Sequence, residues 1–246
     1  MATVFKKTSM LTDAPSHYCP GCTHGVAHRL TAEVIEELGY KENVVGVAPV
    51  GCAVFAYNYF NCDMQQAAHG RAPAVATGIK RVLGEDTLVF AYQGDGDLAS
   101  IGLAEIVHSA ARGENFTVIF INNAIYGMTG GQMAPTTLLG QKATTCQAGR
   151  DPKVNGNPIK ICEMLSTLDG VAYVERVALG SVGGIRKAKR ALTKAFKYQI
   201  EKKGFTLVEM LSTCPTNWRM TPKQAMDYVN EEMQKIYPPG VFKEVK

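Results

Sequence analysis

Short apolar runs alternate with stretches of helical periodicity along most of the chain. The strongest apolar runs, each bounded by turn-forming residues, are 43–49, 87–92, 116–121, 171–177 and 205–211. Such near-continuous runs are typical of strands buried on both faces of a parallel sheet. Helical spacing of apolar residues predicts helices at 24–38, 73–83, 98–112, 159–168 and 186–203. This alternation predicts an α/β fold with a mostly parallel sheet and helices on both faces.

Capping and turn-forming residues set the expected boundaries of these elements. Thr23 is a candidate N-cap for the first helix, and Gly39 is a candidate left-handed terminator. We expect residues 1–213 to form one α/β domain and residues 214–246 to form a C-terminal extension. The longest predicted loop is 143–158.

Composition places the chain among ordinary globular proteins. Of its 246 residues, 46% are hydrophobic and 20% are charged, and no apolar run approaches the roughly 18 residues that span a bilayer. The N-terminus lacks the apolar core and cleavage site of a signal peptide. We therefore expect a cytoplasmic location and no membrane partner.

Net charge adds little to this interpretation. The surplus of +4 is concentrated in the predicted helix 186–203, where Leu192, Phe196 and Ile200 share one face. That spacing favours a helix with a packed face and a solvated basic face, rather than a nucleic-acid patch. We expect no nucleic-acid partner, whereas acidic proteins and anionic ligands remain open.

The run Gly94-Asp95-Gly96-Asp97 follows a predicted strand and leads into a predicted helix. Open α/β sheets bind ligands at the carboxyl ends of their strands, glycine lets the backbone approach a ligand, and a helix N-terminus favours an anion. An aspartate there would repel a phosphate unless a cation lay between them. Asp95 therefore predicts Mg²⁺ bridging the protein and a phosphate.

The second half of such a site is expected at the tip of the neighbouring strand. Asn123 follows the strand at 116–121, and one helix and one strand separate it from Asp95, as a right-handed crossover requires. The side-chain carbonyl of Asn123 and the backbone carbonyl of Ile125 are oxygen ligands that suit Mg²⁺. We expect Asp95, Asn123 and Ile125 to bind one ion.

These motifs resemble those of a known family. The segment from GDGD to NN is similar to the fingerprint of thiamine diphosphate enzymes. The segment NNAIYGMTGGQ resembles the β subunits of 2-oxoacid:ferredoxin oxidoreductases, of the 2-oxoisovalerate and 2-oxoglutarate branch. The resemblance implies a thiamine diphosphate-binding domain that holds its cofactor through Gly94, Asp95, Gly96, Asp97, Asn123, Ile125, Tyr126 and Gly127.

A third segment, HGRAPAVATGIKR at 69–81, is similar to the family's cofactor-contacting segment. It implies that His69 and Arg71 contact the cofactor or a partner subunit, with His69 as a candidate catalytic residue. A structural role for His69 is equally open, because a lone histidine is more often structural.

The cysteines are a second group of candidate functional residues. On the residues alone, the Cys19-x-x-Cys22 pair fits zinc, a redox dithiol or half of an iron–sulfur site. The resemblance selects Cys19, Cys22, Cys52 and Cys214 as ligands of a [4Fe–4S] cluster. Cys52 and Cys214 each follow a predicted strand, so both can reach the edge of the sheet where the cofactor is expected, and Cys52 is expected to contact the cofactor too. The remaining cysteines are expected to be ordinary thiols: Cys62, Cys146 and Cys162.

The resemblance also implies an activity. A 2-oxoacid is oxidatively decarboxylated with coenzyme A to acyl-CoA and CO₂, and electrons pass through the cluster to ferredoxin. The family activates its cofactor with a glutamate on a pyrimidine-binding domain, and 246 residues leave room for only one thiamine-type domain. We therefore expect a larger α subunit that supplies that domain and its glutamate, and further small γ and δ subunits.

The sequence says less about the substrate than about the cofactors. Residues 53–60, AVFAYNYF, are apolar and aromatic, with no Arg or Lys to pair a distal substrate carboxylate. This favours a branched-chain 2-oxoacid such as 2-oxoisovalerate, with 2-oxoglutarate as the alternative. Two other readings stay open: a non-redox thiamine-dependent decarboxylase or acetolactate-type subunit, and a non-catalytic metal-stabilised interaction module.

Overall fold

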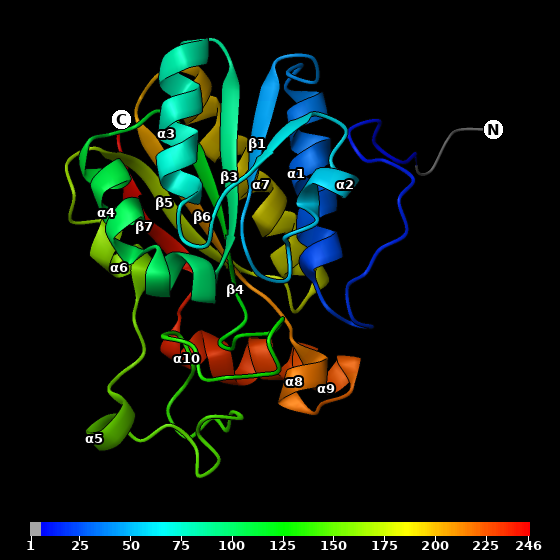
Figure 1. Ribbon diagram of the computed structural model, residues 1–246, viewed down its shortest axis with the longest axis vertical. Coiled ribbons are helices and arrows are strands. Elements are labelled where there is room, and N and C mark those ends of the chain that lie inside the picture. Colours follow the sequence, from blue (N-terminus) through cyan, green and yellow to red (C-terminus); the bar gives the residue numbers. More distant parts are fainter. Residues whose placement is uncertain (1–5) are drawn as a thin grey trace.

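The computed structural model describes residues 6–246, which contain a seven-stranded sheet in the order β2-β1-β3-β4-β6-β5-β7 (Figure 1). The strands are β1 (Val44–Ala48), β2 (Asp63–Gln66), β3 (Leu88–Gly94), β4 (Thr117–Asn122), β5 (Val171–Ala178), β6 (Phe205–Leu211) and β7 (Gly240–Glu244). β1 to β6 pair in parallel, and β7 pairs antiparallel with β5 at one edge. The predicted α/β fold with a mostly parallel sheet is confirmed.

Helices cover both faces of the sheet (Figure 1). The helices of the two faces are α1 (His24–Glu37) and α7 (Val182–Ile200) on one, and α3 (Ala72–Leu83), α4 (Leu103–Ala111) and α6 (Ile161–Leu165) on the other. Within β3, Phe90 and Tyr92 pack in the core beside α1 and α7, whereas Val89 and Ala91 pack in the core beside α3 and α4. Because both faces are covered, the strand is apolar at successive positions.

Two helices differ from their expected bounds. The helix predicted at 98–112 begins with a π-helical turn, η1 (Asp97–Ile101), and α4 starts only after Gly102. Gly102 lies against the loop that holds Gly70, since a Cβ at Gly102 would be 2.9 Å from Gly70 Cα. The helix predicted at 159–168 is limited to α6. The close approach of Gly70 and Gly102 was not visible in the apolar pattern of the sequence.

The expected caps of the first helix had mixed outcomes. Gly39 has a φ of +80°, as expected for a left-handed terminator. Thr23 occupies the N-cap position but makes no side-chain capping bond. Its hydroxyl instead lies 2.7 Å from Ser212 Oγ and accepts from Thr213 N at 3.1 Å. Thr23 therefore ties the N-terminal segment to the segment after β6, and the predicted cap is wrong.

The C-terminal segment runs along the carboxyl edge of the sheet. Its helices are α8 (Pro215–Trp218), α9 (Pro222–Tyr228), η2 (Val229–Met233) and α10 (Gln234–Ile236), and they lie below the sheet in Figure 1. Leu211, Met233 and Tyr237 share a buried cluster with Leu138 of the long loop after β4. β7 then joins the sheet, so the expected extension completes the sheet of the preceding segment. The domain boundary at 213 stays a prediction.

Outside the C-terminal segment, three short elements were not expected from the sequence. They are α2 (Ala56–Tyr59), the edge strand β2, and α5 (Pro152–Asn155), which lies inside the predicted loop. Each is too short to leave a periodic signal.

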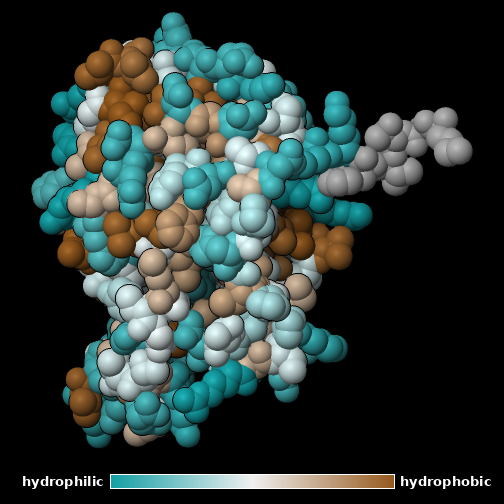
Figure 2. Space-filling model, turned by 45° about the vertical axis from the view of Figure 1, so that its right-hand side comes forward, coloured by the Kyte–Doolittle hydropathy of each residue, from teal (hydrophilic) through white to brown (hydrophobic). Residues whose placement is uncertain are grey.

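The surface mixes polar and apolar residues. Figure 2 shows teal and white residues over most of one face, with brown apolar patches between them. Among residues 6–246, no helix is long and apolar enough to cross a membrane. The cytoplasmic location stays a prediction.

Candidate functional site

The segments that follow β1, β3 and β4 surround a cavity of about 130 Å³. Gly94 of β3 pairs with Ile121 of β4, so the residues after these strands emerge side by side. The cavity lining includes the predicted cofactor-contacting residues except Arg71: Cys52, His69, Gly94, Asp95, Gly96, Asp97, Asn123, Ile125, Tyr126 and Gly127. The sheet therefore brings together segments that are far apart in sequence.

Asp95 is buried and fully engaged by donors. One carboxylate oxygen accepts from Gly96 N at 2.9 Å, and the other accepts from Thr136 Oγ1 at 2.6 Å and Ile125 N at 3.2 Å. Burial raises the pKa of Asp95 to about 6, and these hydrogen bonds oppose that effect. A bound cation would stabilise the charged carboxylate that burial disfavours.

Asn123 completes a convergence of oxygens at the same point. One atom of its side-chain amide lies 2.7 Å from the carbonyl oxygen of Ile125 and 3.2 Å from Asp95 Oδ1. If that atom is nitrogen, it donates to both. If it is oxygen, three oxygens face one another with no proton between them, which is the kind of ligand set that Mg²⁺ prefers. The predicted trio of Asp95, Asn123 and Ile125 is thus gathered and fits a divalent cation.

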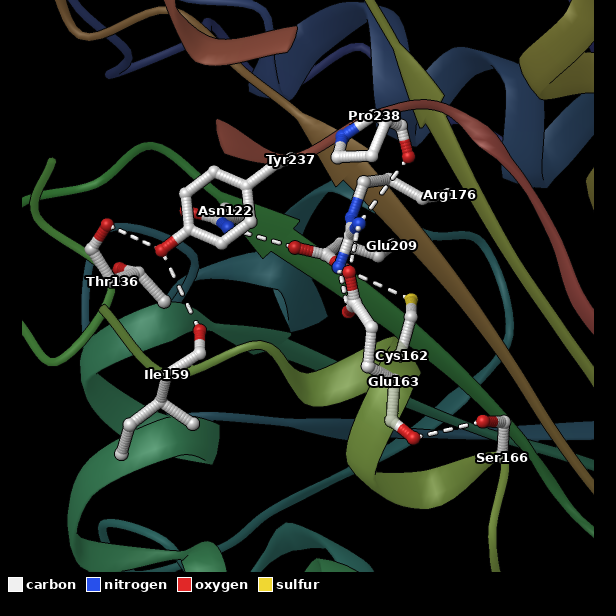
Figure 3. A network of polar contacts seen from close by, with 10 residues as sticks. All are labelled: Asn122, Thr136, Ile159, Cys162, Glu163, Ser166, Arg176, Glu209, Tyr237 and Pro238. Atoms are coloured by element: carbon white, nitrogen blue, oxygen red, sulfur yellow. Dashed lines mark hydrogen bonds and ion pairs between the residues drawn. The ribbon is translucent and has the colours of Figure 1, made fainter. Parts of the chain in front are cut away.

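The neighbouring Asn122 supports the turn from inside the protein (Figure 3). Its Nδ2 donates to Glu209 Oε1 at 2.7 Å, and its Oδ1 accepts from Ala124 N at 3.1 Å. Ala124 has a φ of +57°, an unusual conformation for a residue with a Cβ. The other oxygen of Glu209 accepts from Arg176 Nε at 2.7 Å and from Cys162 Sγ at 2.9 Å. A buried ion pair in β5 and β6 therefore holds the turn that presents Asn123.

A second buried contact reaches Asp95 from the C-terminal segment. Tyr237 donates its hydroxyl to the carbonyl oxygen of Thr136 at 2.6 Å, and Thr136 in turn donates to Asp95. The Tyr237 ring also lies 5.3 Å from the Arg176 guanidinium (Figure 3). Arg176 and Glu209 left a signal in the sequence, since each interrupts an apolar strand. Thr136 and Tyr237 left none.

Asp97 organises the loop beside the cavity. Its buried carboxylate accepts from His69 Nδ1 at 2.5 Å, Gly70 N at 2.9 Å and Gln93 Nε2 at 2.6 Å. This contact requires a proton on Nδ1, so Nε2 is the acceptor when His69 is neutral. His69 is therefore held by Asp97 with its ring in the cavity wall.

Arg71 lies apart from the cavity. Its guanidinium pairs with Glu105 and donates to the carbonyl oxygen of Ile101 at 3.4 Å. Arg71 is not among the cavity-lining residues, and its predicted contact with the cofactor or a partner subunit stays a prediction.

A second cavity, of about 230 Å³, adjoins the first. It is lined by Cys19, Cys22, Cys52 and Cys214 together with His17, Tyr18, Phe55 and Asn217. The two cavities share wall residues: Cys52, Asn123, Gly127 and Met128. A Cβ at Gly127 would lie 2.9 Å from Cys52 Sγ and 3.6 Å from Cys214 Sγ, so both sulfurs lie close to the backbone at Gly127.

The remaining cysteines lie elsewhere. Cys162 is in the Glu209 network, Cys146 Sγ lies 3.5 Å from Asn155 Oδ1, and Cys62 packs against the core. Burial raises the pKa of Cys22 and Cys52 to about 12, and neither cavity is lined by a Lys or Arg of the described residues. Bound metal would therefore be needed to keep these thiols as thiolates.

The cysteine geometry separates two kinds of metal site. Within residues 6–246, no three His, Cys, Asp or Glu side chains are placed to hold a single metal ion. A zinc site requires its ligands to converge on one point. In a [4Fe–4S] cluster each cysteine binds a different iron, so thiols spread around a cavity fit the cluster better.

A histidine and tyrosine cluster in the wall was not predicted. His24 Nδ1 lies 2.9 Å from Tyr92 Oη, and its ring stacks on Tyr18 with centroids 4.8 Å apart. His24 lines the first cavity and Tyr18 the second. Burial lowers the pKa of His24 to about 3, which keeps this part of the first cavity's lining uncharged.

Comparison with known proteins agrees with this geometry. The family model "Thiamine pyrophosphate enzyme, C-terminal TPP binding domain" matches residues 49–210, so the chain belongs to the thiamine pyrophosphate enzymes. Within that class it belongs to the 2-oxoacid:ferredoxin oxidoreductase subunits, as its motifs predicted. It is 51% identical to ketoisovalerate oxidoreductase subunit VorA of Methanothermobacter marburgensis, over 98% of this chain and 50% of that protein.

Two further relatives support the assignment. The chain is 39% identical to 2-oxoglutarate synthase subunit KorB of Methanocaldococcus jannaschii, over 82% of this chain and 70% of that protein. Among solved structures it resembles the 2-oxoglutarate:ferredoxin oxidoreductase of Magnetococcus marinus, with a TM-score of 0.79 and 25% identity, covering 99% of this chain and 86% of that one. The chain spans about half the length of its VorA relatives.

Proposed function

We propose that this chain is the cofactor-binding β-type subunit of a 2-oxoacid:ferredoxin oxidoreductase. The complex would convert a 2-oxoacid and coenzyme A to acyl-CoA and CO₂ and pass electrons through a [4Fe–4S] cluster to ferredoxin. The observation that carries the proposal is the common wall, Cys52, Asn123, Gly127 and Met128, between the diphosphate-motif cavity and the four-cysteine cavity. A non-redox decarboxylase has no use for the second cavity.

In this proposal the first cavity binds the metal and diphosphate, and the second cavity binds the cluster. Asp95, Asn123 and the carbonyl of Ile125 hold Mg²⁺, which binds the diphosphate. Cys19, Cys22, Cys52 and Cys214 hold the cluster. When bound, thiamine diphosphate supplies the nucleophilic carbon for decarboxylation, and the protein supplies orientation and an outlet for electrons. His69, with Nδ1 fixed by Asp97, presents Nε2 for a proton or a polar contact.

A partner subunit is needed to complete the site. The first cavity is smaller than the ~300 Å³ lower limit usual for ligand pockets, which supports a cofactor only partly enclosed by this chain. No glutamate lines either cavity in the described part of the chain. A larger α subunit would supply the pyrimidine-binding domain and the activating glutamate, and small γ and δ subunits would carry electrons onward.

The proposed substrate is a branched-chain 2-oxoacid of the 2-oxoisovalerate type. Among residues 6–246, no Lys or Arg lines either cavity, so this part of the chain offers no partner for the distal carboxylate of 2-oxoglutarate. The higher identity to proteins named for ketoisovalerate than to those named for 2-oxoglutarate points the same way.

The test is an assay of the native complex, purified with its partner subunits. We expect coenzyme A-dependent dye reduction that is faster with 2-oxoisovalerate than with 2-oxoglutarate, and no turnover by this chain alone. Faster turnover of 2-oxoglutarate would mean that the partner subunit supplies the Lys or Arg that pairs its distal carboxylate. If no 2-oxoacid is oxidised by a complex loaded with thiamine diphosphate, Mg²⁺ and iron, the proposed function is wrong. Iron with no thiamine binding would favour an interaction module.

A further inference from the structure

Asn217 of α8 joins the two cavities. Its Nδ2 donates to the carbonyl oxygen of Gly127 at 2.9 Å and to Cys214 Sγ at 3.3 Å. The carbonyl of Gly127 is an acceptor only, so the amide atom that faces it is the nitrogen, and the same nitrogen faces the sulfur. One side chain thus contacts a cysteine of the second cavity and the loop of the first.

The fold confines this side chain. Gly131 has a φ of +82°, and a Cβ there would lie 3.1 Å from Asn217 Oδ1 and 3.2 Å from Asn217 Cβ. Asn217 therefore fills the space that a glycine leaves open, in a half-buried position. Its amide is held in place before any ligand binds.

Among the described residues, the other three cysteines have no such side-chain contact, although the backbone N–H of His24 faces the Cys22 sulfur. The backbone N–H of Asn217 also faces the Cys214 sulfur and remains when the side chain is replaced. In the described part of the chain, no other side chain donates a hydrogen bond to the sulfur of Cys19, Cys22, Cys52 or Cys214. Because no described Lys or Arg lines the four-cysteine cavity, N–H groups rather than cations are available to offset negative charge at the sulfurs.

We propose that Asn217 raises the reduction potential of the cluster by donating an N–H···S hydrogen bond to Cys214. The inference rests on the proposed function, in which Cys214 is a cluster ligand. Reduction adds one electron, taken from the oxidation of the 2-oxoacid, and moves no proton onto the cluster. A hydrogen bond aimed at a ligand sulfur stabilises the added negative charge, which raises the potential. Asn217 is therefore a positioning residue that favours electron transfer out of the cofactor cavity.

The experiment is a redox titration of the complex followed by electron paramagnetic resonance. The signal of this cluster is identified as the one that Cys214→Ala abolishes. Asn217→Leu removes the donor at nearly constant volume, and we expect a lower potential with unchanged iron content. Asn217→Asp keeps the shape but replaces the donor with an anionic acceptor, and we expect a larger decrease.

Asn230→Leu is the matched control. Asn230 is also half-buried and lies against a glycine, Gly180. It donates to the carbonyl oxygen of Gly180 at 2.8 Å, as Asn217 donates to that of Gly127. It contacts no cysteine in the described hydrogen bonds. We expect a comparable loss of stability and no change in potential.

Each outcome decides between the hypotheses. An unchanged or raised potential in Asn217→Leu and Asn217→Asp overturns the inference. Loss of the cluster from both variants, with retention in Asn230→Leu, assigns Asn217 a purely structural role and overturns it too. A wild-type complex with no iron signal sensitive to Cys214→Ala contradicts the proposed function itself.

Discussion

At the scale of single residues, the site depends on buried polar groups at strand tips. Asp95 and Asn123 are only 3% and 6% exposed, yet each directs an oxygen-bearing side chain to the same point. Burying such groups costs free energy unless hydrogen bonds or a cation compensate for the loss of water. The site therefore holds together polar groups that the fold alone would not favour.

We expect Asp95→Asn to weaken Mg²⁺-dependent binding of thiamine diphosphate. Removing the only charged member of the oxygen trio should cost about 2 kcal/mol or more of binding free energy, or over tenfold in affinity. Calorimetry on the assembled complex measures this, with iron content expected to stay constant. Asp86→Asn is the control, because the side chain of Asp86 is 92% exposed. Unchanged Mg²⁺-dependent affinity would contradict the metal site.

Burial of His28 makes stability depend on pH. It lowers the pKa of His28 well below the ordinary 6.5, and neighbouring His24 adds to the effect. Below pH ~6.5 the unfolded chain binds a proton that the folded chain does not, so the free energy of unfolding falls as pH falls. The limit is about 1.4 kcal/mol per pH unit for one such group.

His28→Gln should make that decline less steep. Gln keeps an acceptor for the Tyr18 hydroxyl, which lies 2.9 Å from His28 Nε2, but cannot take a charge. Unfolding temperature between pH 7 and pH 5 is the measurement. His108→Gln, at an exposed position of α4, should leave the pH dependence as it is. If unfolding temperature falls equally with pH in wild type and His28→Gln, the proposed difference in protonation of His28 between the folded and unfolded chain is wrong.

At the scale of elements, the most informative feature is a charged pair inside two apolar strands. Arg176 of β5 and Glu209 of β6 are both 0% exposed, and Glu163 of α6 pairs with Arg176 at 2.6 Å (Figure 3). Burial alone would lower the pKa of Arg176, but Glu163 and Glu209 hold it above its ordinary value. The ion pair is therefore maintained in the folded state.

Removing one partner leaves the other charge buried and poorly paired. We expect Glu209→Ala to reduce the free energy of unfolding by about 3–5 kcal/mol. Glu201→Ala, which breaks an exposed pair with Lys203, should cost about 1 kcal/mol or less. Urea unfolding of the chain, followed by fluorescence of its single tryptophan, compares the two. Equal losses of unfolding free energy in Glu209→Ala and Glu201→Ala would mean that water replaces the Glu209 carboxylate beside Arg176.

The predicted elements succeeded where the pattern was long and apolar. β6 has the expected bounds, 205–211, and β3 and β4 were recognised to within two residues. The π-helical start of α4 and the bond of Thr23 to Ser212 were not predictable. Both depend on a neighbouring segment that the local sequence does not contain.

At the scale of the whole molecule, the C-terminal segment completes both the sheet and the site. β7 covers the edge of β5, and its Phe242 ring lies 4.7 Å from the Arg176 guanidinium. The same segment supplies Cys214, Asn217 and Tyr237 to the two cavities and their supports.

Deleting residues 240–246 should expose β5 as a sheet edge. We expect a lower unfolding temperature and a tendency to self-associate, because an unpaired strand edge pairs with other chains. Removal of Lys246 alone is the control. Thermal unfolding and size-exclusion chromatography make the measurement. A monodisperse truncated chain with unchanged unfolding would show that β7 is dispensable.

The sequence by itself determined the fold class, the family and the residues that carry the motifs. A long apolar run predicts a buried strand because its side chains must be removed from water, whatever they pack against. A motif such as Gly-Asp-Gly can be recognised because its residue types and their spacing are local to the sequence. Only the tertiary structure decided that the two cavities share a wall, that Asp97 in the lining of the first cavity holds His69, and that Arg71 lies outside that cavity. It also revealed the contacts that Asn217, Arg176 and Glu209 make, because hydrogen bonds between segments distant in sequence form only when the chain is folded.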